Sequence, residues 1–127
     1  MQNLPENFRH VRLLLAREQG HPDGEADHGY DILLPLTPDG HIDGDTATAH
    51  KSSCRVRRFR PGEADAVGVL ARGPGGHWAV DYPGTGSHND EPAFRFEDEK
   101  FEQGEYMSIK DDDGTMHTFR VALVESL

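Results

Sequence analysis

The chain has 127 residues and a formal net charge of −10. A chain of this length is expected to form one domain, residues 1–127, that buries about two-thirds of its unfolded surface. The negative charge argues against double-stranded DNA as a partner, because phosphate binding needs a basic surface. The single cysteine excludes an internal disulfide and a zinc site built from several thiolates.

The first periodic segment, Glu6 to Gln19, is compatible with a strand or with a helix. As a strand it places Leu13 and Leu15 on one face, and as a helix it ends at Gly20. We favour the strand because residues 30–36 provide a matching antiparallel partner.

A short helix is expected next, over Thr46 to Ser52, with Asp45 as its cap. Alternating runs then predict strands at residues 54–60, 67–72, 77–82, 93–96, 105–110 and 115–124. The last two are joined by an Asp-Gly turn and predict a β-hairpin with Phe119, Val121 and Leu123 on one face. In the first run, Val56 and Phe59 have opposite phases, which a bulge near Arg57 and Arg58 would reconcile.

These elements predict an all-β fold. The expected architecture is a small antiparallel β-barrel or compact sandwich of about six to eight short strands, with room for one short helix near 46–52. Cys54 shares the phase of Val56 and is therefore expected to be buried and unreactive.

The segment from Lys51 to Arg60 is basic and contains no acidic residue. One interpretation is a surface strand that pairs with the acidic second half, within one molecule or across a dimer. The other is an anion site. Guanidinium groups near aromatic rings can also stack on a base or an aromatic ligand. This hypothesis selects a ligand-binding set of Arg57, Arg58, His77, Trp78 and Tyr82. The alternative is that the aromatic residues are core.

A second hypothesis concerns metal. Imidazoles and carboxylates crowd the segment from residue 21 to residue 28, where oxygen and nitrogen donors could hold a divalent cation. The candidate ligands are His21, Asp23, Glu25 and His28. Residues 39–45 form a similar segment, but neither matches the spacing of a calcium loop.

No Gly-x-Ser-x-Gly turn and no phosphate loop ending in Lys-Ser/Thr occurs in the sequence. We therefore predict a non-enzymatic module, without a cofactor, that binds a small anionic or aromatic ligand or a protein partner. A metal-binding protein or metal-dependent enzyme is the alternative, and a homodimer is compatible with both. With no signal peptide and no membrane-length apolar run, the expected location is the cytoplasm, away from membranes.

Overall fold

The computed structural model describes residues 4–16, 25–72, 78–81, 91–92, 100–110 and 116–127. Its strands are β1 (Phe8–Leu15), β2 (Glu25–Pro35), β3 (Arg55–Phe59), β4 (Ala66–Arg72), β5 (Trp78–Asp81), β6 (Glu91–Pro92), β7 (Tyr106–Lys110) and β8 (Met116–Ser126). They form one antiparallel sheet in the order β6-β5-β4-β3-β2-β1-β8-β7. The predicted all-β fold is confirmed.

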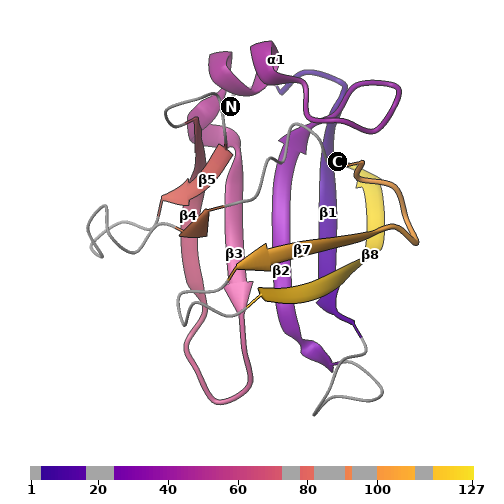
Figure 1. Cartoon of the computed structure of the whole chain (residues 1–127). Coiled ribbons are helices and arrows are strands. Elements are labelled where there is room, and N and C mark those ends of the chain that lie inside the picture. Colours follow the sequence, from indigo (N-terminus) through magenta and orange to yellow (C-terminus); the bar gives the residue numbers. More distant parts are fainter. Residues whose placement is uncertain (1–3, 17–24, 73–77, 82–90, 93–99, 111–115) are drawn as a thin grey trace.

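The sheet curls into an open barrel. β7 and β8 cross in front of the strands β1 to β3, and α1 (Gly44–Ala49) lies over one end (Figure 1). β6 approaches β7, but no backbone ladder joins these two strands within the described segments. The concave side of the sheet encloses the core, and the convex side faces away from it. We call the second side the convex face.

The strand assignment of the first segment is confirmed. β1 pairs with β2 on one side and with β8 on the other, so it is an interior strand of the sheet. Val11, Leu13 and Leu15 are all buried on the concave side. The hairpin of β7 and β8 is also confirmed, whereas the predicted strand at 93–96 lies outside the described residues.

A β-bulge interrupts β8 at Ala122. Leu13 of β1 faces Val121, but the preceding residue, Arg12, faces Leu123, so β8 carries one extra residue between these pairs. Because side chains alternate with a period of two, one extra residue exchanges the faces beyond it.

The bulge overturns one prediction about the hairpin. Phe119 and Val121 are buried, but Leu123 is only half-buried and does not share their face. Beyond the bulge, Val124 packs against the core. Glu125 is thereby placed on the convex face.

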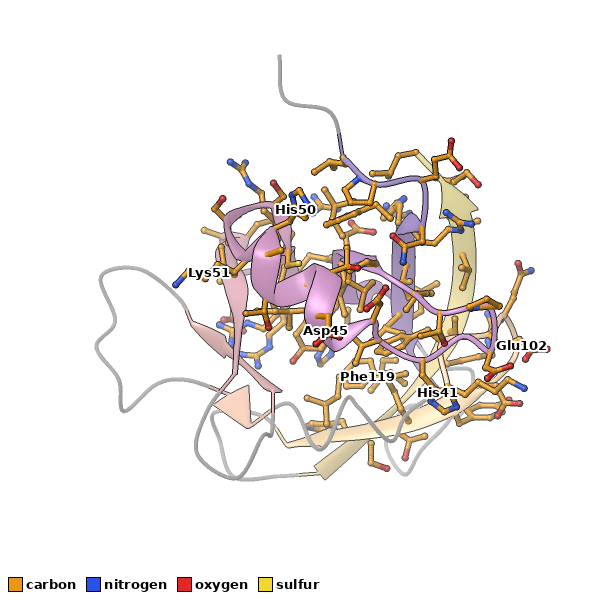
Figure 2. All side chains as sticks on the ribbon, turned by 90° about the horizontal axis from the view of Figure 1, so that it is seen from above. His41, Asp45, His50, Lys51, Glu102 and Phe119 are labelled. Carbon is orange, nitrogen blue, oxygen red and sulfur yellow. The ribbon has the colours of Figure 1, made fainter. Side chains whose placement is uncertain are left out.

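The short helix is confirmed, but it begins two residues earlier than predicted and has a different cap. Asp43, not Asp45, accepts a hydrogen bond from the Thr46 backbone N–H at 3.3 Å and another from the Thr46 hydroxyl at 2.8 Å. A 3₁₀ turn, η1 (Lys51–Ser53), follows. Figure 2 shows Lys51 at this end of the barrel, pointing away from the body of the molecule. Among the described residues, no helix is both long enough and apolar enough to cross a membrane.

The bulge predicted near Arg57 and Arg58 is absent. β3 pairs with β2 in unbroken register, with Arg58 opposite Tyr30 and Phe59 opposite Gly29. Phe59 therefore keeps the phase of Arg57, on the convex face, instead of turning into the core.

Cys54 is completely buried, as predicted, and burial raises the pKa of its thiol to about 11. We expect 5,5′-dithiobis(2-nitrobenzoate) to label the folded protein slowly at about pH 8, because the reacting thiolate is scarce and shielded. In denaturant the same reagent should label one thiol per chain at once. Rapid labelling without denaturant would contradict this burial.

Gly29 lies so close to β1 that a side chain cannot be added without moving the backbone. A Cβ at this position would lie 1.9 Å from the carbonyl oxygen of Leu13. We expect Gly29→Ala to lower the free energy of unfolding by about 3 kcal/mol, measured in urea. Gly62→Ala is the control, because a Cβ there has open space and only the positive φ of 74° opposes it. Its cost should be about 1 kcal/mol, and equal costs would argue against the close approach of Gly29.

Candidate functional site

The convex face of three neighbouring strands carries a row of alternating charges. The register places Arg12 of β1 opposite Asp31 of β2, and Asp31 opposite Arg57 of β3. Arg12 donates to the two carboxylate oxygens of Asp31 at 2.9 and 3.3 Å, and Arg57 donates to Asp31 from the other side. One carboxylate thus joins the two outer strands across the middle one.

The surroundings of Asp31 keep it ionised. Its side chain is only 14% exposed, and this burial alone raises the pKa of the carboxyl. Hydrogen bonds from Arg12, Arg57 and His10 outweigh burial and lower the pKa of Asp31 to about 2.

His10 lies on β1 and connects Asp31 of β2 to β8, the strand on the other side of β1. Its Nε2 lies 2.8 Å from an oxygen of Asp31, and its Nδ1 lies 3.0 Å from an oxygen of Glu125. A neutral imidazole has one N–H and can donate to only one of these carboxylates, whereas the imidazolium donates to both. Burial lowers the pKa of His10, but the hydrogen bonds to Glu125 and Asp31 prevail, and the pKa is raised above 6.5.

An aromatic ring supports both arginines. The guanidinium carbons of Arg12 and Arg57 lie 5.9 and 5.1 Å from the ring centroid of Phe59, which is cation–π distance. Arg57 also donates to Asp65 at 3.0 Å. We call these residues the Asp31 network: His10, Arg12, Asp31, Arg57, Phe59, Asp65 and Glu125.

An open hollow of about 650 Å³ adjoins the network. Leu33, Val67 and Leu127 contribute apolar surface to it, and the last two are 54% and 64% exposed. Arg55 lines the β3 side and Glu125 lines the β8 side. The side chain of Arg55 is exposed and forms no hydrogen bond or ion pair with any described residue.

The predicted ligand-binding set is divided by this arrangement. Arg57 belongs to the network, but Arg58 has the opposite phase, opposite the buried Tyr30, so these two arginines do not converge. Trp78 begins β5, two strands away from β3, and its side chain is not described. His77 and Tyr82 lie outside the described residues, and their part in a site stays a prediction.

The metal hypothesis stays a prediction. His28 is described, and its ring lies 5.9 Å from that of His117 and 5.7 Å from that of Phe119, measured between centroids. His21 and Asp23 lie outside the described residues, and nothing is described of the Glu25 side chain. In the described part of the chain, no group of three or more His, Cys, Asp or Glu side chains is placed to hold a metal ion.

In the second acidic segment, residues 39–45, the carboxylate of Asp43 is engaged by the helix cap. It also accepts a hydrogen bond from the side chain of Asn7 at 3.0 Å. Its role there is to begin α1.

Only Arg57 of the network belongs to the site residues predicted from the sequence; the other six members were not selected, namely His10, Arg12, Asp31, Phe59, Asp65 and Glu125. A signal for three of the seven was present. Arg12, Asp31 and Arg57 occupy the polar phase of successive strands, and opposite charges in that phase are expected to pair once the strands are aligned.

No family model matches the chain, and no curated protein and no solved structure shows a significant match to it.

Asp31→Asn is expected to lower the free energy of unfolding by about 2 to 3 kcal/mol near neutral pH, because it leaves three cationic groups without their shared carboxylate. Asp65→Asn is the control, because Asp65 is exposed and pairs with Arg57 at the edge of the network. This substitution should lower the free energy of unfolding by less than about 1 kcal/mol. Urea unfolding measures both, and equal costs would show that Asp31 does not hold the strands together.

The network should also give stability a definite pH dependence. Asp31 stabilises the fold above its unfolded pKa of 3.8, and this contribution is lost as the pH falls toward 2. His10 stabilises the fold fully below its unfolded pKa of 6.5. This contribution is lost as the pH rises through the raised pKa of His10 in the folded state. We expect the contribution of the network to be largest between pH 3.8 and 6.5. Asp31→Asn should flatten the acidic side of the urea-unfolding profile and His10→Gln the alkaline side; unchanged profiles would contradict the assignment.

Proposed function

We propose that the chain is a non-enzymatic binding module that holds an amphipathic group of its ligand on the convex face. The apolar part of that group lies in the hollow, which Leu33 lines, and its anionic part meets Arg55. The observation that carries this proposal is the exposed Arg55, which has no ion-pair partner among the described residues and lines an apolar hollow.

The distribution of apolar residues supports a binding face. An antiparallel sheet normally covers its core with one face and presents a polar face to water. Here the concave face already holds the core, yet exposed Val67 and Leu127 lie together on the other side. Apolar surface gathered in this way, with charged groups at its margin, is typical of an interaction site.

The choice of cationic residues also supports binding to a protein. The described cations around the network and hollow include three arginines, namely Arg12, Arg55 and Arg57, and no lysine. Arginine and aromatic residues are enriched in protein interfaces, and lysine is depleted. Because Asp31 and Phe59 already hold Arg12 and Arg57 in place, these side chains lose little further freedom when a ligand binds.

A small probe tests this proposal directly. The anion 4-methylpentanoate joins the branched end of a leucine side chain to a carboxylate, so it presents both groups to the hollow. We expect it to shift the backbone amide signals of Leu33, Arg55 and Val67 in NMR spectra, with a dissociation constant on the order of 1 mM.

Arg55→Ala should weaken this binding several-fold, because it removes the cation that has no partner in the described structure. Lys51→Ala is the matched control: it also removes one exposed cation, but at the α1 end of the barrel (Figure 2). Shifts that are absent from the convex face, or that both variants reduce equally, would contradict the proposed function.

A further inference from the structure

We propose that the protein partner of the convex face is a second copy of this chain, packed face to face about a twofold axis. The axis runs parallel to the strands, between β1 and β2. This inference rests on the proposed function, because it uses the same face. It specifies the partner by the pattern of charges on that face.

Twofold symmetry dictates which strands meet. A half-turn about an axis parallel to the strands exchanges the two sides of the face, as in any isologous interface. With the axis between β1 and β2, β1 of one copy lies over β2 of the other. β3 then lies over β8 of the other copy, because the order in the sheet is β3-β2-β1-β8.

The first cross-strand row has opposite charges at its two ends. Glu125 of β8 faces His10 of β1, and His10 faces Leu33 of β2. The register of β2 and β3 pairs Ile32 with Val56, which places Arg55 next to Leu33 in the same row. The half-turn brings Arg55 of each copy opposite Glu125 of the other, and Leu33 opposite His10.

The second row is complementary at its centre. It runs from Leu123 of β8 through Arg12 and Asp31 to Arg57 of β3. The same axis brings Arg12 of each copy opposite Asp31 of the other. Arg57 lies opposite Leu123, where the aliphatic stem of the arginine packs on an apolar side chain.

The charges on this face allow two copies to approach despite their net charge of −10 each. The described arginines and carboxylates around the hollow and network are balanced: Arg12, Arg55 and Arg57 against Asp31, Asp65 and Glu125. Charges elsewhere on the chain repel at long range, but salt at about 0.15 M screens them beyond about 8 Å.

The size of the face predicts a weak dimer. Four strands about 4.8 Å apart and about seven residues long present a projected area on the order of 450 Å². Stable interfaces bury about 800 Å² on each partner. We therefore expect a dissociation constant in the micromolar range, so that monomer and dimer both occur at ordinary laboratory concentrations.

Sedimentation velocity between about 5 and 500 µM tests the proposal with the full chain. The wild type should shift from monomer to dimer as its concentration rises. Arg55→Glu and Glu125→Arg should each weaken the dimer at least about tenfold, because each places two like-charged pairs in the interface. Lys51→Glu is the matched control for Arg55→Glu; it makes the same change in net charge at the α1 end and should leave association unchanged.

Mixing the two single variants is the decisive measurement. In a mixed dimer, the carboxylate introduced by Arg55→Glu in one chain meets the guanidinium introduced by Glu125→Arg in the other. The unchanged Arg55 and Glu125 of the two chains also meet, so both pairs are restored. We expect the equimolar mixture, and also the double variant R55E/E125R, to associate about as tightly as the wild type. A variant that was merely misfolded would not be rescued by mixing.

A wild type that stays monomeric throughout this range would overturn the inference, as would a dimer indifferent to Arg55→Glu or a mixture that fails to associate. If 4-methylpentanoate still binds the hollow of such a monomer, the proposed function stands and the face binds a different protein. If the probe also fails to bind, both proposals are wrong.

Discussion

The carboxylate of Asp31 is the interaction on which the convex face depends. It accepts hydrogen bonds from Arg12 on one side and Arg57 on the other, so it ties the middle strand of the barrel wall to both neighbours. The arrangement has consequences beyond stability. Two guanidinium groups that are fixed by a shared carboxylate and a shared ring, Phe59, present their charge in one geometry. A face that is rigid before binding loses less entropy when it binds.

The bulge at Ala122 decides what lies beside this carboxylate. Without the extra residue, Glu125 would share the phase of Val121 and point into the core. With it, Glu125 reaches His10 at 3.0 Å and extends the network to β8. A local irregularity in one strand therefore converts a pair of cross-strand contacts into a network that spans β8, β1, β2 and β3.

Much of the fold follows from alternation along the sequence, but the candidate site does not. The pairing of β1 with β2, the hairpin of β7 and β8 and the burial of Cys54 follow from the period-two pattern of apolar residues. The bulge could not be read in the same way, because Leu123 and Val124 are both apolar and either phase is acceptable. The basic strand was misleading for a related reason. Arg57 and Arg58 are adjacent in sequence, and adjacent residues of a strand face opposite sides.

Glu125 and Arg55 differ in a way that bears on association. Glu125 already has a partner within the chain, His10, whereas Arg55 has none among the described residues. A charge that keeps an internal partner gains less from a new one, because its field is already partly compensated. Each Arg55–Glu125 pair of the proposed dimer therefore gains less than a pair of two unpartnered charges would. Such an interface is specific in its register but modest in affinity, since complementary charges direct which surfaces meet more than they tighten the contact.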